Sequence, residues 1–179
     1  MGISRRLPSR QQLAQVYAII VLILYSWTIL WFFWKLPTWR IFLTGWEITG
    51  VLAFSLATVL VESLIALGIP VVVALCLPRR WFGDVFVARG GSLAASALGY
   101  MMFLGDQLKY EMEYPKLGLD GWLLALPVAA IVMIVYAAGR IGWLRRITES
   151  LAERATIFLF LMPPLSVIAI FILVIRVLA

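Results

Sequence analysis

Residues 57–70 read ATVLVESLIALGIP, an apolar stretch that contains one carboxylate, Glu62. This stretch lies inside a longer apolar run over residues 48–77, which is long enough to cross the roughly 30 Å hydrocarbon core of a membrane as a helix. Backbone polar groups in hydrocarbon must be paired within the chain, so the run predicts a membrane-spanning helix. The function then depends on what surrounds an acid at this depth.

The composition places the whole chain among membrane proteins. Of its 179 residues, 64% are hydrophobic and 13% are charged. The mean hydropathy is +1.02, which lies outside the range of soluble globular domains. We therefore predict an all-α fold, a single transmembrane helical domain over residues 1–179 with short interfacial amphipathic segments.

Five apolar windows are candidates for crossing the membrane. They cover residues 13–34, 48–77, 90–107, 121–139 and 155–177. The third window is short and rich in Gly, Ala and Ser, so a re-entrant or interfacial segment is the alternative to a full crossing there.

The positive charge of the loops favours five crossings. With the N-terminus in the cytoplasm, ten of the 15 Lys and Arg residues fall on the inner side: Arg5, Arg6, Arg10, Arg79, Arg80, Arg89, Arg140, Arg145, Arg146 and Arg154. Without the third crossing, nine would lie inside and six outside. Because inner loops are enriched in Lys and Arg, we predict five transmembrane helices with the N-terminus inside and the C-terminus outside. The net charge of +6 follows from this topology and is no evidence for nucleic-acid binding.

Aromatic residues indicate where the outer membrane surface lies. Trp27, Trp31, Trp34, Trp39 and Trp46 gather around the first outer loop, where amphipathic rings favour the headgroup layer. We expect residues 35–47, KLPTWRIFLTGWE, to lie along that surface. Anchoring is one interpretation of this segment, and a binding face for a partner's helix is the other.

The residue types that the chain lacks exclude several chemistries. There is no His and a single Cys, Cys76, so His-ligated haem, a Ser-His-Asp triad, the usual nitrogen ligands of zinc and an internal disulfide are all excluded. We predict no catalytic residues, no metal site and no cofactor.

Glu62 belongs to a polar stripe with Ser55 and Thr58, which lie at helical offsets of three and four. A charged carboxylate at the bilayer centre costs about 3 kcal/mol on insertion scales, so the stripe should face the bundle interior or water. In one interpretation Glu62 hydrogen-bonds a neighbouring helix. Its candidate partners there are Tyr25, Ser26, Thr28, Tyr100 and Tyr136. In a second it takes up a proton or cation, and in a third it meets a polar group on a second subunit.

Two further segments are candidate contact surfaces. Gly91, Ala95 and Gly99 recur every four residues and form a candidate helix-packing face, because small residues let helices approach closely in lipid. On the cytoplasmic side, GWLRRITESLAER is predicted to be an amphipathic interfacial helix. One interpretation is that this helix docks onto a cytosolic partner or anionic lipid, and the other is that it only connects two spans. Its candidate interface comprises Trp143, Arg145, Arg146, Ile147 and Leu151.

Three functions remain open from the sequence. The first is a non-catalytic helical subunit or scaffold of a larger membrane assembly. The second is a small proton- or cation-coupled transporter or channel using Glu62. The third is a membrane enzyme acting on a lipid-linked substrate through the outer-face acids Asp106, Glu111, Glu113 and Asp120. The expected partners are the lipid bilayer and other membrane subunits or further copies of the chain. The expected location is the cytoplasmic membrane of a bacterium or archaeon.

Overall fold

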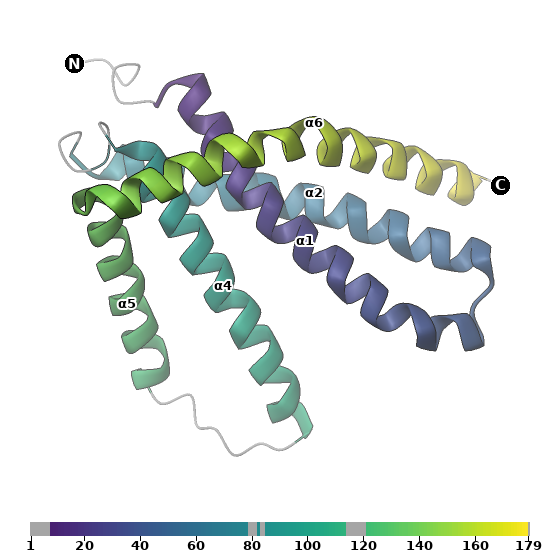
Figure 1. Cartoon of the computed structure of the whole chain (residues 1–179). Helices are drawn as coiled ribbons and strands as arrows, with labels where there is room; N and C mark the ends of the chain where they lie inside the picture. The colour runs from purple at the N-terminus through teal and green to yellow at the C-terminus, as the bar shows by residue number, and fades with distance from the viewer. Residues whose placement is uncertain (1–7, 79–81, 83–84, 114–120, 179) are drawn as a thin grey trace.

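The chain is helical throughout the part that the structure describes. The computed structural model describes residues 8–78, 82, 85–113 and 121–178. Five long helices occupy most of this part: α1 (Arg10–Phe42), α2 (Gly45–Cys76), α4 (Phe86–Glu113), α5 (Gly121–Arg140) and α6 (Gly142–Leu178) (Figure 1). The predicted all-α class is confirmed.

Three of these helices are long and apolar enough to cross a membrane. They are α1, α2 and α6, which correspond to the first, second and fifth apolar windows of the sequence. Helix α5 adds a shorter apolar stretch, Ala125–Arg140, among the residues described. Helix α4 is the least hydrophobic of the five, because its sequence includes Arg89 and, in its last two turns, Asp106, Gln107, Lys109, Glu111 and Glu113.

Capping boxes define where the first two helices begin. Ser9 and Gln12 exchange backbone-to-side-chain hydrogen bonds at the start of α1, and Thr44 and Glu47 do the same at the start of α2. Each box pairs two backbone N–H groups that the helix itself leaves without a partner. Between the helices, Leu43 and Thr44 have extended backbone, so α1 and α2 form an antiparallel hairpin with a very short connection.

Helix α1 lies at the centre of the packing. Val16, Ile19, Ile20, Val21 and Tyr25 are all at most 1% exposed. They join clusters that reach α2, α4 and α6, in which the opposing residues include Ala53, Ala66, Ala94, Ala152 and Ala169. Small residues on the neighbouring helices let their backbones come close to α1.

The helices form two arms that diverge from this centre. Figure 1 shows α1, α2 and the C-terminal half of α6 running side by side, while α4 and α5 form a second arm that points elsewhere. Helix α6 crosses the junction and bends near its middle (Figure 1). Pro163 and Pro164 lie near the middle of its sequence, where each removes an intrahelical hydrogen bond.

The structure bears on two local predictions. The segment after Gly142 is not a separate interfacial helix, because α6 runs without interruption from it into the fifth apolar window. Within residues 35–47, α1 continues through Pro37 to Phe42 and α2 starts at Gly45. That this segment lies along the membrane surface stays a prediction.

Candidate functional site

Glu62 lies in the wall of an open hollow between α1, α2 and α4. The hollow has a volume of about 500 Å³, and Glu62 is exposed into it rather than enclosed by other helices. Within the described part of the chain, no residue forms a hydrogen bond or ion pair with its carboxylate. The expectation that Glu62 faces the bundle interior or water stays a prediction. We call this cavity the Glu62 hollow.

The predicted polar stripe is only partly brought together. Ser55 shares the wall of the hollow with Glu62, whereas Thr58 is exposed and lies outside that wall. The Ser55 hydroxyl donates to the Val51 carbonyl at 2.9 Å, and the Thr58 hydroxyl donates to the Phe54 carbonyl at 3.0 Å. Both protons are thus used within α2, which leaves the hydroxyl oxygens as acceptors.

Two hydroxyl pairs join helices in the described part of the chain, and of their four residues only Tyr25 was a candidate from the sequence. Ser63, next to Glu62, is fully buried and shares a hydrogen bond of 3.1 Å with the Tyr17 hydroxyl on α1. Tyr25, expected as a partner of Glu62, instead shares a bond of 2.7 Å with Ser166 on α6. The buried face of α2 has helical spacing, as Leu56, Val59, Ser63, Ala66 and Pro70 show. The opposite face is equally apolar, so hydropathy could not distinguish the two.

Aromatic rings from α1 form one side of the Glu62 hollow. These are Trp27, Trp31, Phe32 and Trp39, and Lys35 and Thr28 lie among them. The Trp27 and Trp31 rings meet edge to face at 6.1 Å, and the Lys35 ammonium lies 5.8 Å from the centre of the Trp31 ring. Helix α4 contributes Leu98, Met101, Met102 and Gly105 to the opposite side. The cavity therefore combines one acid, one base and a largely aromatic surface.

The candidate helix-packing face divides into a packed half and an uncovered half. Gly91 is buried, and a Cβ at this position would lie 2.6 Å from Ile19 Cδ1 and 3.2 Å from Thr148 Cγ2. Ala95 packs beside Ile19 in the same contact. Gly99 is exposed, and a Cβ there would meet nothing within 4 Å. Gly91 and Ala95 thus join α4 to α1 and α6, whereas Gly99 does not contribute.

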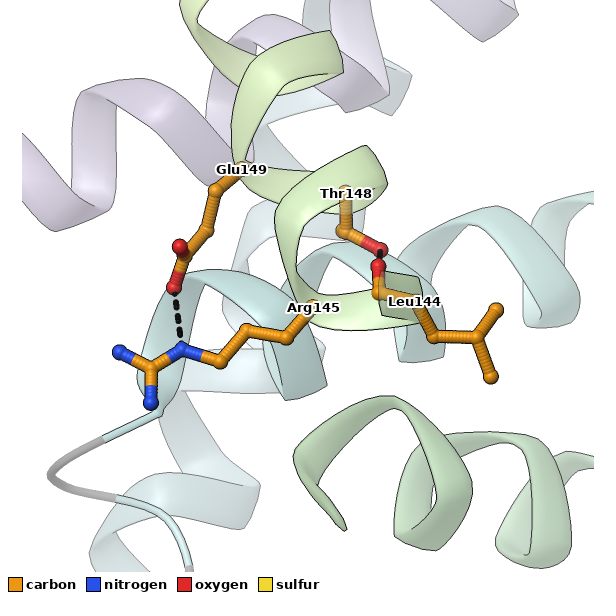
Figure 2. Close-up of polar contacts among 4 residues, drawn as sticks. All are labelled: Leu144, Arg145, Thr148 and Glu149. Atoms are coloured by element: carbon orange, nitrogen blue, oxygen red, sulfur yellow. Dashed lines mark hydrogen bonds and ion pairs between the residues drawn. The ribbon is translucent and has the colours of Figure 1, made fainter. Parts of the chain in front are cut away.

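The candidate cytoplasmic interface lies on the first turns of α6, where Trp143, Arg145, Arg146, Ile147 and Leu151 are all exposed. The Arg145 Nε donates to Glu149 Oε1 at 2.8 Å one turn later, and the Thr148 hydroxyl donates to the Leu144 carbonyl (Figure 2). Since this ion pair is itself exposed, it stabilises the local helix only weakly.

A second hollow, of about 870 Å³, lies between α2, α4 and α5 and is almost wholly apolar. Arg89 stands in its wall. A Cβ at Gly139 on α5 would overlap the Arg89 guanidinium, so this glycine leaves the room that the Arg89 side chain occupies between α4 and α5.

The four outer-face acids cannot be assembled into a site from the described residues. Asp106, Glu111 and Glu113 belong to the last part of α4, where the side chains lie outside the described residues, and Asp120 lies outside them altogether.

Comparison with known proteins adds no relative. No family model, no curated protein and no solved structure matches the chain. The functional argument therefore rests on the residues and their arrangement.

Proposed function

We propose that this chain is a non-catalytic helical subunit of a larger membrane assembly, whose partner is another membrane-spanning chain. The observation that carries the proposal is how little of α6 its own chain covers. Only 11% of the most apolar window of α6 is buried, compared with 44% for α1. The inner face of the helix, with Ala152, Ala155, Ser166 and Ala169, is buried, and its flanks are partly covered. The outer face, which includes Phe160 and Phe171, is exposed.

Two further features support an intermolecular role. The arm formed by α4 and α5 diverges from α1, α2 and the C-terminal half of α6 (Figure 1). A Cβ at Gly99 on α4 would meet nothing within 4 Å. The carboxylate of Glu62 is exposed on a helix that is apolar enough to span a membrane. An uncovered carboxylate at membrane depth is unfavourable, so water or a further polar group must meet it in the assembled state.

The proposed topology has five transmembrane helices, with the N-terminus inside and the C-terminus outside. The proposed location is the cytoplasmic membrane of a bacterium or archaeon. In this arrangement α6 crosses the bilayer, and its exposed face points sideways within the membrane, where another helix can contact it.

Site-specific cross-linking tests the proposal. A photoreactive group at Phe171, which is exposed on α6, should form an adduct with a second membrane chain in native membranes. The same group at Ala169, which is buried against α1 and α2, should form none. Mass determination in lipid nanodiscs gives a second readout. A chain that is monomeric there, with no adduct at Phe171, would contradict the subunit role.

A small proton- or cation-coupled transporter or channel is the second candidate. The observation that favours it is the Glu62 hollow, which brings a carboxylate and the Ser55 hydroxyl to one open cavity. Reconstituted vesicles should then show a proton or cation flux that Glu62→Gln abolishes. Flux that is absent, or that is unchanged by this substitution, would reject Glu62 as the coupling site.

A further inference from the structure

The Glu62 hollow has the chemistry of a binding site for a lipophilic cation. Its volume of about 500 Å³ falls in the range of small-molecule sites, and its walls are mostly aromatic and aliphatic with a few polar groups. Glu62 supplies a negative charge that no described residue neutralises through a hydrogen bond or ion pair. A carboxylate on an apolar helix, beside mostly apolar walls, favours a positive partner.

The aromatic wall strengthens this preference. Rings attract cations through the negative charge of their faces, and quaternary ammonium groups are commonly recognised in this way. The Lys35 ammonium, 5.8 Å from the centre of the Trp31 ring, is already held by such a contact. Met101 and Met102 on the opposite side supply flexible, polarisable groups that can adapt to a bulky ligand.

The two charges of the hollow lie at different depths. Glu62 is 17 residues beyond the first residue of α2, and Lys35 is seven residues before the last residue of α1. At 1.5 Å per residue these positions lie about 25 Å and about 10 Å from the ends of the hairpin. The acid therefore lies roughly 15 Å deeper than the base along the hairpin, which leaves a space for a ligand beyond Lys35.

The donor set favours an organic cation over a metal ion. One carboxylate and the hydroxyls of Ser55 and Thr28 are fewer side-chain oxygen ligands than the six to eight that Ca²⁺ takes. Among the residues searched, those that the structure describes, no group of three or more His, Cys, Asp or Glu lies together.

We propose that the Glu62 hollow binds a lipophilic organic cation, such as a quaternary phosphonium or ammonium compound. The positive centre lies against Glu62, and the apolar substituents contact Trp27 and Trp31 on one side and the two methionines on the other. Lys35 at the outer end weakens the binding of such a cation by like-charge repulsion. The inference concerns binding by the single chain, so it stands apart from the subunit role and requires no transport.

Binding of tetraphenylphosphonium to the purified chain in lipid nanodiscs tests the inference, with tetraphenylborate as an anion of the same size and shape. We expect saturable binding of one phosphonium ion per chain and no saturable binding of the borate. Glu62→Gln should weaken phosphonium binding at least tenfold, while Glu62→Asp should retain most of it. Lys35→Gln should strengthen it severalfold.

Glu153→Gln is the matched control, because it makes the same change of charge on an exposed part of α6 outside the hollow. It should leave phosphonium binding unchanged. Equal effects of the Glu62 and Glu153 substitutions, or saturable borate binding that Lys35→Gln weakens, would overturn the inference. Glu62→Gln should weaken phosphonium binding and Lys35→Gln should strengthen it. Poor folding can only weaken binding, so the gain at position 35 still tests the inference if the Glu62 variant folds poorly. Failure here, with the Phe171 adduct intact, would leave the subunit proposal standing.

Discussion

The hydroxyl groups of Tyr25 and Ser166 lie 2.7 Å apart, although 141 positions separate the two residues in the chain. The bond joins α1 to α6 inside the cluster that also contains Val21, Ala53 and Ala169. Both side chains are buried, so loss of one hydroxyl leaves the other without a partner in an apolar environment.

Tyr25→Phe and Ser166→Ala should therefore each lower the free energy of unfolding by about 0.5–2 kcal/mol. The double variant should cost less than the sum of the two single changes, because the bond is lost only once. Equilibrium unfolding in mixed micelles of increasing SDS content measures these values. Fully additive effects would indicate that the two hydroxyls do not depend on each other.

Gly91 and Gly99 form a matched pair on α4 that tests the packing of this helix. Gly91→Leu should destabilise the chain by about 1–3 kcal/mol, because the new side chain must displace Ile19 and Thr148. Gly99→Leu should change stability little, since nothing lies within 4 Å of the position. The same unfolding assay in a detergent that keeps the chain monomeric gives both values. Similar losses at the two positions would contradict the packed arrangement of Gly91.

Gly50 on α2 allows close approach of Arg176 from the end of α6. A Cβ at Gly50 would overlap the Arg176 guanidinium, which also interacts electrostatically with Glu47 one turn earlier. Since the overlapping atoms are the far end of a flexible side chain that can turn away, Gly50→Val should lower the free energy of unfolding by at most about 1 kcal/mol.

Gly68→Val is the control for this change on the same helix, because a Cβ at Gly68 would meet nothing within 4 Å. Arg176→Ala should restore part of the stability of Gly50→Val by removing the overlapping group. No recovery in that double variant would show that Gly50 matters for another reason.

Labelling of introduced cysteines tests the proposed topology. Cys76→Ser removes the single native cysteine, and Thr38 and Ser150 are exposed positions for new ones. Thr38→Cys should react with a membrane-impermeant maleimide added outside intact cells, and Ser150→Cys should react only after the cells are opened. If α4 did not cross the membrane, Ser150→Cys would be reached from outside, so this position distinguishes five crossings from four.

The positions of the helices could be predicted more fully than the contacts between them. The apolar windows over residues 13–34 and 155–177 lie inside α1 and α6, because a long apolar run in lipid must pair its own backbone groups. The ends of the helices were harder to anticipate. The stretches at residues 39–42 and 143–147 carry charged and aromatic residues typical of an interface. Both nevertheless belong to a long helix, although most of their side chains are exposed.

The candidate site shows the same division. Glu62 could be selected from the sequence because a carboxylate is rare in an apolar run. Its companions in the hollow could not, since Trp31 and Lys35 on α1 and Met102 on α4 reach it only through the packing of three helices. Ser63 was not selected, because the sequence does not show that it is buried. Its burial and its hydrogen bond depend on Tyr17 of α1 lying opposite.

The amino-acid sequence by itself determined that this protein is helical and apolar enough for a membrane. In hydrocarbon, the N–H and C=O groups of a long apolar run must be hydrogen-bonded within the chain, and a helix does this. Which side of each helix is covered was decided only by the tertiary structure. Both faces of α2 are apolar, so burial of Ser63 and exposure of Glu62 follow from where α1 and α6 pack. Residue volume and close helix approach, which hydropathy does not record, select that arrangement.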